Sequence, residues 1–523
     1  MWHQPERSFH PPRTSTLVAA LADPKVYPHP VERVELIETH ISWVFLAGER
    51  VYKIKKPVDL DFLDFTTLAR RRFYCHEEVR LNRRLAPDVY LGVVELKGSR
   101  HRPRFGGPGR TLEVAVEMRR LPAERMLDRL IRANAAPPDL MDAIAATLAG
   151  FHAAAASGKE IDVFGGTGVV RKNWEENFTQ TAALGPHLLP HDQRQALRAY
   201  VDAFIELESH RFAERVRSGR IRDCHGDLQA QHVCCTEPIR IFDCIEFNHR
   251  FRFGDTASEI AFLAMDLERL GRSDLTIRFL NSYLEESGDY EALPLLDFYR
   301  AYRAFVRGKV VSFQVADHPE LADQVRALFS LAARYAEPRA PARLIVMTGV
   351  MGSGKSTAAR MIAARIGAIV IRTDAVRKRL GGLSVHERAL HGFGEGLYTP
   401  EMGRQTYAET LRLAREGLVA GWSVIVDGSF STGAERDEAR DVADRLGVPF
   451  ALVWCDAPDS EIVARLDRRH GDPSEVSDGR SELFSAHRAR YESPEKEPDL
   501  VRVNTTQGPD RAIDDAIRLL RGK

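Results

Sequence analysis

The feature that most constrains the fold lies at residues 349–357, where the chain reads GVMGSGKST. An apolar run, LIVMT, precedes this segment, and a helical pattern, AARMIAARI, follows it. The spacing is G-x-x-x-x-G-K-[ST] between a strand and a helix, and a chance match is on the order of 1% or less. Glycines in such a loop let successive backbone N–H groups point at a polyphosphate, at the positive end of the following helix. The segment therefore predicts a nucleotide-binding site.

The polar residues of this loop have chemical roles in that setting. We expect Lys355 to reach the β- and γ-phosphates of ATP and the Ser356 hydroxyl to bind Mg²⁺. The alternative is a glycine-rich turn without a ligand. The predicted nucleotide-contacting residues of the loop are Gly349, Gly352, Ser353, Gly354, Lys355, Ser356 and Thr357.

From residue 344 onwards, apolar runs alternate with helical patterns. The apolar runs are LIVMT, AIVIRT, SVIVD and FALVWCD. Such alternation predicts βαβ units and hence an α/β domain with a parallel sheet. The segment has about 180 residues, which leaves little room for the helical lid domain of the motor-type AAA+ ATPases.

Further candidate site residues follow the second, third and fourth apolar runs. Asp374 ends a strand where ligands of open α/β sheets bind, so it is a candidate base for a substrate hydroxyl; the alternative is a helix cap. Asp427 is a candidate ligand of Mg²⁺ through water, or else part of a strand-end turn. Arg465, Arg468 and Arg469 are candidates to close over the phosphoryl group as a lid, or else surface cations.

This layout resembles the small P-loop kinases that phosphorylate hydroxyl groups. Among them are gluconate kinase, shikimate kinase, chloramphenicol phosphotransferase and the kinase half of polynucleotide kinase. The resemblance covers about 342–523. It implies Asp374 as the base that orients the substrate and the arginines after Pro458 as the lid.

The first two thirds of the chain have a different pattern of predicted strands and helices. Short β-like runs occupy about 36–120, and helical patterns dominate 123–217 and 256–335. The segment YAEPRAPAR at 335–343 has two prolines and no apolar periodicity, which indicates a boundary. We expect a loose N-terminal arm at 1–30, an α+β domain of a β-rich lobe and a helical lobe at 31–335, a linker at 336–343, and the P-loop domain at 344–523.

Two carboxylates of the N-terminal half are spaced to share one site. Asp227 in DCHGDLQAQH and Asp243 in IFDCIEF are 16 residues apart, separated by a loop and a predicted hairpin. In kinase-like folds the first such carboxylate is the catalytic base and the second holds Mg²⁺. Upstream, a predicted strand carries Lys53, and the next helix offers Glu78, or else Glu77, as the partner of a lysine that fixes the α- and β-phosphates.

These motifs resemble the aminoglycoside phosphotransferase family, a branch of the protein-kinase-like fold that also contains choline and homoserine kinases. The family's H-G-D signature appears as His225-Gly226-Asp227, and its later aspartate as Asp243. The segments THISWVFL, KIKKPV, LNRRLAPDVYLGVV and DCIEF look like a bacterial group in which such a domain is fused to a P-loop ATPase. The resemblance covers both halves in this order. It implies an ATP-dependent kinase that acts on small hydroxylated molecules.

One position departs from that family. The family usually has asparagine five residues after the catalytic aspartate, as a second metal ligand, whereas this chain has His232. Mg²⁺ prefers oxygen ligands, and imidazole suits softer metals. Either Gln231 or water replaces the ligand, or this lobe binds nucleotide with weak or no transfer.

The composition limits which cellular compartment and which kinds of partner we expect. Lys+Arg 74 and Asp+Glu 74 cancel, so no global positive charge favours nucleic acid or anionic lipid. Six scattered cysteines and the absence of an apolar leader or membrane-length run favour a cytoplasmic protein that has no membrane partner.

Three hypotheses follow from these patterns. The first is a two-domain phosphotransferase that uses MgATP in both domains. The second is a regulatory or pseudokinase N-terminal domain that controls a P-loop kinase or ATPase, and His232 favours it. The third is a P-loop kinase that acts on a cell-wall sugar nucleotide or a nucleic-acid end, and zero net charge argues against the latter. The patterns identify neither acceptor nor the oligomeric state.

Overall fold

The computed structural model describes residues 16–60, 62–388, 395–469, 476–477, 479–506 and 509–522. The chain forms two compact units, and each unit combines segments that are distant in sequence. The first unit contains residues 1–135 and 222–254, and the second contains 136–221 and 255–523.

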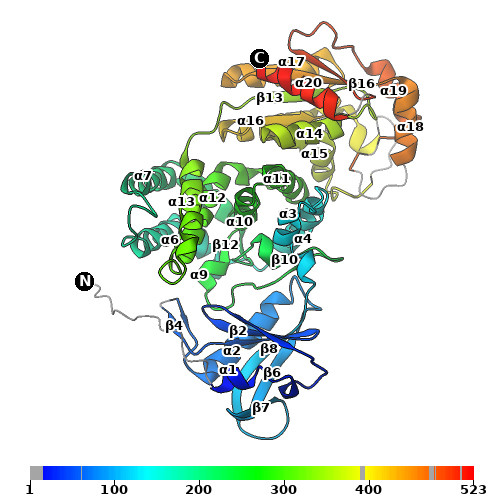
Figure 1. The fold of residues 1–523 in the computed structure, drawn as a ribbon. Helices are drawn as coiled ribbons and strands as arrows, with labels where there is room; N and C mark the ends of the chain where they lie inside the picture. The colour runs from blue at the N-terminus through cyan, green and yellow to red at the C-terminus, as the bar shows by residue number, and fades with distance from the viewer. Residues whose placement is uncertain are drawn as a thin grey trace. The chain divides into compact units, whose positions relative to one another are not determined.

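The first unit is built on a six-stranded antiparallel sheet with the order β1-β2-β3-β8-β6-β7 (Figure 1). Its strands are β1 (Val34–Glu38), β2 (Ser42–Ala47), β3 (Arg50–Lys55), β6 (Tyr90–Ser99), β7 (Arg102–Phe105) and β8 (Thr111–Arg119). Helix α2 (Leu68–Asn82) packs on β6 and β8 through Cys75 and Val79, which meet buried valines of the sheet. This packing places the inner face of α2 against strand β3, where the candidate lysine lies.

Shorter elements complete the first unit. They are α1 (Thr16–Ala20), β4 (Asp59–Leu60), β5 (Leu63–Asp64), α3 (Leu127–Arg132), β10 (Val233–Cys234), β11 (Arg240–Ile241) and α9 (His249–Arg252). Strands β10 and β11 form the hairpin predicted between the two aspartates. Strands β9 (Ile221–Asp223) and β12 (Phe253–Asp255) lie where the chain passes from one unit to the other.

The prediction of a loose arm at 1–30 is wrong for the residues that the structure describes. Val18, Leu21, Val26 and Tyr27 are buried in one cluster with residues of β2 and β3. The Tyr27 hydroxyl also donates a hydrogen bond to the backbone oxygen of Leu21, at 2.8 Å. The segment is ordered because these few apolar side chains cover one face of the sheet. Residues 1–15 lie outside the described part.

The second unit contains a helical region and a P-loop domain. The helices of the first are α4 (Leu140–Ala154), α5 (Lys159–Asp162), α6 (Thr167–Gln180), α7 (His191–Leu207), α8 (Ser209–Arg217), α10 (Thr256–Arg269), α11 (Ser273–Ser287), α12 (Leu296–Ser312) and α13 (Ala322–Ala336). Helix α10 is buried on nearly all sides, as its apolar sequence dictates.

The P-loop domain has a five-stranded parallel sheet with the order β14-β15-β13-β16-β17. The predicted α/β domain with a parallel sheet is therefore confirmed. Its strands are β13 (Leu344–Thr348), β14 (Ile369–Arg372), β15 (Val424–Asp427), β16 (Phe450–Asp456) and β17 (Leu500–Asn504). Its helices are α14 (Lys355–Ile366), α15 (Thr373–Leu380), α16 (Pro400–Val419), α17 (Gly433–Leu446), α18 (Asp459–Arg469), α19 (Ser481–Arg490) and α20 (Pro509–Gly522).

The segment between α13 and β13, within the expected linker at 336–343, contacts both the helical region and the P-loop domain. The Arg339 guanidinium donates to the Asp297 carboxylate at 2.6 and 2.8 Å and lies 3.3 Å from the Trp422 ring centroid. The Trp422 Nε1–H in turn donates to the backbone oxygen of Leu293 at 3.2 Å. These contacts join the two regions into one compact unit.

Hydropathy along the helices gives one further observation. In the described part of the chain, no single helix has the length and apolar character that crossing a bilayer requires. The pair Leu140–Ala154 and Lys159–Gly165, bent by 117°, satisfies that test only when taken together.

Candidate functional site

A cavity of about 90 Å³ lies at the carboxyl ends of β13, β14 and β15. The central strand β13 has β15 and β16 as its two neighbours, so the cavity occupies the edge of the sheet where ligands of such folds bind. It is lined by Met351, Gly352, Gly354, Lys355, Ser356, Arg372, Thr373, Asp374, Arg377, Tyr407, Asp427, Gly428, Ser429 and Ser477. Six of the predicted site residues, Gly352, Gly354, Lys355, Ser356, Asp374 and Asp427, thus line one cavity.

The loop before α14 has the backbone that a phosphate cradle needs. Gly349 has a φ of +141°, and a Cβ there would lie 2.5 Å from the backbone oxygen of Cys455. Gly354 precedes the helix with a φ of +94°, in the left-handed region that favours glycine. The Ser353 hydroxyl is buried and has no hydrogen-bond partner among the described residues. These residues fit a bound polyphosphate, because side chains at the glycines would fill the cradle.

Lys355 is the first residue of α14 and folds back over the loop. Its Nζ donates to the backbone oxygens of Gly349 and Val350, both at 2.9 Å. The ammonium group is therefore already held over the cradle by two neutral acceptors, in a position from which it can bind phosphate oxygens.

Asp374 lies in the first turn of α15. The residue at the N-cap position is Arg372, so the alternative reading of Asp374 as the helix cap is wrong. Its Oδ1 accepts a hydrogen bond from Arg377 Nη1 at 2.7 Å. Burial would raise the pKa of the Asp374 carboxyl, but the Arg377 cation and the Ser477 hydroxyl outweigh burial and lower that pKa below its ordinary value. The carboxylate is therefore ionised at neutral pH and able to accept a hydrogen bond from an acceptor hydroxyl.

Asp427 is the last residue of β15 and is almost fully buried. Its Oδ2 lies 3.6 Å from Arg372 Nε, and the residue lines the same cavity as Ser356. A buried carboxylate and a hydroxyl on one cavity wall are the oxygen ligands that Mg²⁺ prefers. The predicted metal role of Asp427 remains a prediction.

The structure separates the predicted lid arginines. Arg465 donates to the Thr505 hydroxyl and to the Thr505 backbone oxygen, each at 2.9 Å, and Thr505 Oγ1 donates to the Ser353 backbone oxygen. Arg465 is thus held beside the phosphate loop. Arg468 is exposed and pairs with Glu461 at 3.4 Å, as expected of a surface cation. The side chain of Arg469 lies outside the described residues.

His487 is a site residue that the sequence patterns missed. Phe484 and His487 lie at i and i+3 on one face of α19, and Tyr491 follows directly after the helix ends. Phe484 packs against Val350, and the Tyr491 and Thr348 hydroxyls are 3.0 Å apart, so this part of the chain covers the phosphate loop. Burial and the Lys355 cation lower the pKa of His487 to about 4, which leaves a neutral imidazole at physiological pH. No spacing rule identifies a histidine on this helix.

The first unit contains a second charged cluster. Lys53 Nζ lies 2.9 Å from Glu78 Oε1 and 2.5 Å from Asp243 Oδ1, so the predicted lysine–glutamate pair forms and also holds the second aspartate. The alternative partner, Glu77, pairs instead with Arg80 at 2.7 Å. The structure thus brings the predicted residues of the N-terminal half to one place.

The segment around Asp227 has a constrained backbone. Gly226 has a φ of +87°, and a Cβ there would lie 2.7 Å from the backbone oxygen of Phe251. Asp243 has a φ of +65°, which is unusual for a residue other than glycine and is typical of functional sites. Burial would raise the pKa of the Asp243 carboxyl, but Lys53 and then His232 outweigh it and hold that pKa well below its usual range.

His232 stands between the two aspartates. Its Nδ1 lies 2.8 Å from the backbone oxygen of Asp227 and 3.5 Å from Asp227 Oδ2, and its Nε2 lies 3.6 Å from Asp243 Oδ2. Gln231 Nε2 lies 3.1 Å from the same imidazole nitrogen, and Gln229 donates to Asp227 Oδ1 at 2.6 Å. The imidazole therefore lies between the two carboxylates.

A second buried lysine extends the cluster. Lys55 Nζ lies 2.6 Å from Glu78 Oε2 and also pairs with Glu246. Two lysines and three carboxylates thus alternate in one network, and Glu78 contacts both lysines. Such a network fixes the relative positions of β3, α2 and the segment that carries Asp243. The pairing of Lys55 with Glu246 was not predicted from the sequence.

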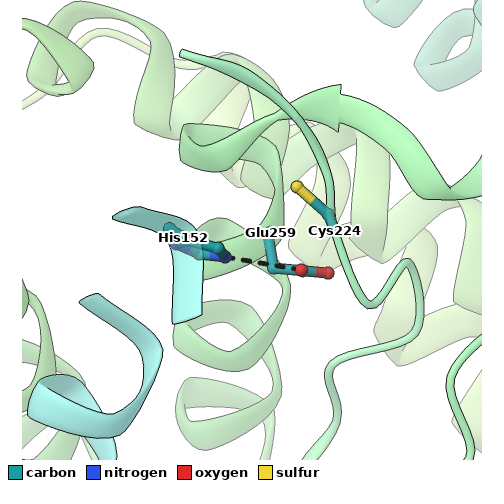
Figure 2. A group of neighbouring side chains, drawn as sticks. All are labelled: His152, Cys224 and Glu259. Carbon is teal, nitrogen blue, oxygen red and sulfur yellow. Dashed lines mark hydrogen bonds and ion pairs between the residues drawn. The ribbon is translucent and has the colours of Figure 1, made fainter. Parts of the chain in front are cut away.

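His152, on α4, lies in a buried polar environment in the second unit. Its Nδ1 lies 2.7 Å from the Tyr283 hydroxyl, and its Nε2 lies 3.5 Å from Glu259 Oε2 on α10 (Figure 2). Both groups are buried. The histidine therefore connects α4 to α10 and α11 inside the helical region.

Comparison with known proteins decides the family. Residues 344–494 match the family model described as an AAA domain. A Mycobacterium tuberculosis protein, "Uncharacterized protein Rv2004c", is 35% identical over 500 residues, which covers 94% of this chain and 97% of the relative. The chain belongs to the Rv2004c family. Because the match spans nearly both lengths, the Rv2004c family combines an N-terminal half and a P-loop half in this order.

Two further similarities each concern one part of the chain. A shikimate kinase of Paramagnetospirillum magneticum is 29% identical over 182 residues, 34% of this chain and 84% of that enzyme. A choline/ethanolamine kinase family protein from Mesorhizobium loti has a solved structure that covers 59% of this chain and 93% of its own, with 13% identity and a TM-score of 0.35. The C-terminal part of this Rv2004c-family chain is accordingly a P-loop domain of the kinase type.

Proposed function

We propose that the P-loop domain transfers the γ-phosphoryl group of MgATP to a hydroxyl group of a small molecule. The observation that carries this proposal is the single cavity that contains the phosphate loop, Lys355 and the two carboxylates Asp374 and Asp427. A buried carboxylate with a lowered pKa in the same cavity as the loop lysine supports transfer to a hydroxyl group over nucleotide binding alone.

Each residue of the cavity has a part in this proposal. The loop N–H groups and Lys355 bind the phosphates, and Ser356 and Asp427 hold Mg²⁺, which supplies neutralisation of the phosphate charge. Asp374 accepts a hydrogen bond from the acceptor hydroxyl and takes its proton during transfer. Arg377 keeps Asp374 ionised and in place. Arg465, bound to Thr505 beside the loop, is available to the transferring phosphoryl group.

The acceptor is a small hydroxylated molecule in this proposal. Tyr407, Ser429 and Ser477 line the cavity together with Asp374, and they supply hydroxyl groups for hydrogen bonds to a polar acceptor. The formal net charge of zero agrees with an acceptor other than nucleic acid.

For the N-terminal half we propose a kinase-like MgATP site made by Lys53, Glu78 and Asp243, with Asp227 as the base. The ion pairs of Lys53 with both carboxylates support this proposal. A regulatory or pseudokinase role is the second candidate, and one observation favours it: the His232 imidazole lies between the aspartates, where an oxygen ligand would serve Mg²⁺ better.

The substitution Asp374→Asn tests the P-loop proposal. It preserves the size of the side chain and removes the proton acceptor, so nucleotide binding should remain while transfer to the acceptor falls roughly 100-fold or more. The measurement is acceptor-dependent ADP release by the full chain, together with nucleotide affinity. The matched control is Asp441→Asn, an exposed residue of α17, which should change neither quantity. Unchanged transfer by Asp374→Asn would show that Asp374 is not the base.

A further inference from the structure

Helix α11 of the helical region closes an edge of the P-loop sheet. Strand β14 is the first strand of that sheet, so one side of its backbone has no neighbouring strand. The Asn281 side chain donates to the backbone oxygen of Ala368 at 3.1 Å and accepts from the backbone N–H of Val370 at 2.8 Å. A single amide thus pairs with the strand edge as another strand would, and it fixes the position of α11 along β14.

One helical turn later, Glu285 reaches the cavity through an arginine. Its Oε1 accepts a hydrogen bond from Arg372 Nη1 at 3.2 Å, and Arg372 Nε lies 3.6 Å from Asp427 Oδ2. The side chains of Glu285, Arg372 and Asp427 are only 18%, 8% and 4% exposed. The guanidinium group is therefore shared between a carboxylate of the helical region and the carboxylate that is expected to hold Mg²⁺.

Close packing keeps α11 in this position. Arg379 donates to the backbone oxygen of Glu285 at 2.8 Å. The helix ends at Gly288, whose φ is +68°, and a Cβ there would lie 2.4 Å from Arg379 Nε. A larger residue at Gly288 would therefore have to displace the Arg379 side chain.

The charges around Asp427 show why it matters that the Arg372 guanidinium is shared between Glu285 and Asp427. Burial and the nearby Arg372 and Arg278 cations lower the pKa of Arg360, so several guanidinium groups crowd this junction. A cation that pairs fully with Asp427 would neutralise it and compete with Mg²⁺ for its oxygens. Glu285 provides Arg372 with an opposite charge in addition to that of Asp427.

We propose that Glu285 is a positioning residue for the P-loop site: it draws the Arg372 guanidinium away from Asp427 and leaves that carboxylate available for Mg²⁺. The helical region, which precedes the P-loop domain in the sequence, thereby sets the metal affinity of that domain. The inference rests on the proposed role of Asp427 and adds to it a residue outside the P-loop domain.

The test is the Mg²⁺ dependence of nucleotide binding by the full chain. Every variant carries Lys53→Met, so that the binding of a fluorescent ATP analogue reports on the P-loop site. In Glu285→Gln, the Mg²⁺ concentration for half-maximal binding should rise about 5-fold or more, while binding in the absence of Mg²⁺ stays the same. Glu285→Asp keeps the charge and should restore most of the Mg²⁺ affinity. If Glu285 had a purely structural role, Glu285→Gln would instead change nucleotide binding both with and without Mg²⁺, together with the melting temperature.

Two comparisons make the result decisive. Glu286→Gln removes the neighbouring ion pair with His386, at 2.6 Å, and should leave the Mg²⁺ dependence unchanged. In the presence of Arg372→Gln, adding Glu285→Gln should have no further effect, because the effect passes through Arg372. An unchanged Mg²⁺ dependence in Glu285→Gln, or an equal effect with and without Arg372, would overturn the inference.

Asp427→Asn distinguishes this failure from a failure of the proposed function. If Asp427→Asn weakens Mg²⁺-dependent binding and Glu285→Gln does not, the positioning role is wrong while the metal role of Asp427 is supported. If Asp427→Asn leaves Mg²⁺-dependent binding intact, the metal role is wrong, and the inference about Glu285 is wrong with it.

Discussion

The substitution Lys355→Ala is expected to reduce nucleotide affinity at the P-loop site about 100-fold or more. The ammonium group is held over the loop by two backbone oxygens, and it makes charge-assisted hydrogen bonds to phosphate oxygens that no other loop side chain can replace. The measurement is binding of a fluorescent ATP analogue to the full chain with Lys53→Met in all variants. The full chain is needed because the contacts of Arg339 and Trp422 join the P-loop domain to the helical region.

A matched control excludes a general effect of losing a lysine. Lys496 is exposed and lies in the same domain, so Lys496→Ala should bind nucleotide as the unmodified chain does. Undiminished affinity in Lys355→Ala would contradict the assignment of residues 349–357 as the nucleotide site.

The second large effect is expected in the N-terminal half, from Asp243→Asn and Asp227→Asn. Asp243 interacts with Lys53 and His232, and its lowered pKa keeps it ionised, so its replacement should weaken Mg²⁺-dependent nucleotide binding at that site roughly 10-fold or more. Asp227→Asn should spare binding and remove transfer, because Asp227 contributes only the acceptor for the hydroxyl proton. Both are measured in the full chain with Lys355→Ala.

His232→Asn decides between the two roles of this half. If His232 substitutes for an oxygen ligand, restoring the amide oxygen should maintain or raise transfer. A pseudokinase instead predicts ATP binding that is little affected by Mg²⁺, and no transfer by the unmodified half or by any of the three variants. Acceptor-dependent ADP release that survives Asp227→Asn would contradict the catalytic role of Asp227.

The local parts of both sites could be predicted from the sequence. The glycine spacing of residues 349–357 dictates the loop, and the strand pattern places Asp374 and Asp427 at the same edge of a parallel sheet. The pairing of Lys53 with Glu78 follows from a strand and the next helix, which are close in sequence. These predictions succeed because each depends on one element and its neighbour.

The remaining features depend on contacts between distant segments, which no local pattern encodes. Lys55 pairs with Glu246 across 191 residues, and Glu285 meets Arg372 across 87. The two prolines at 335–343 indicate a boundary, but the pairing of Arg339 in that segment with Asp297 has no local signal. The packing of Tyr27 against the sheet likewise could not be predicted, because a few apolar residues in a proline-rich segment show no periodicity.

The most direct test of the central claim is phosphoryl transfer by the full chain to a panel of hydroxylated metabolites. ADP formation with MgATP is measured for the unmodified chain, for Lys53→Met and for Lys355→Ala. If the P-loop domain is a hydroxyl kinase, at least one acceptor should stimulate ADP formation, and this stimulation should persist in Lys53→Met and disappear in Lys355→Ala. If every stimulating acceptor instead kept its effect in Lys355→Ala and lost it in Lys53→Met, the account would be contradicted, since all of the transfer would then belong to the N-terminal half.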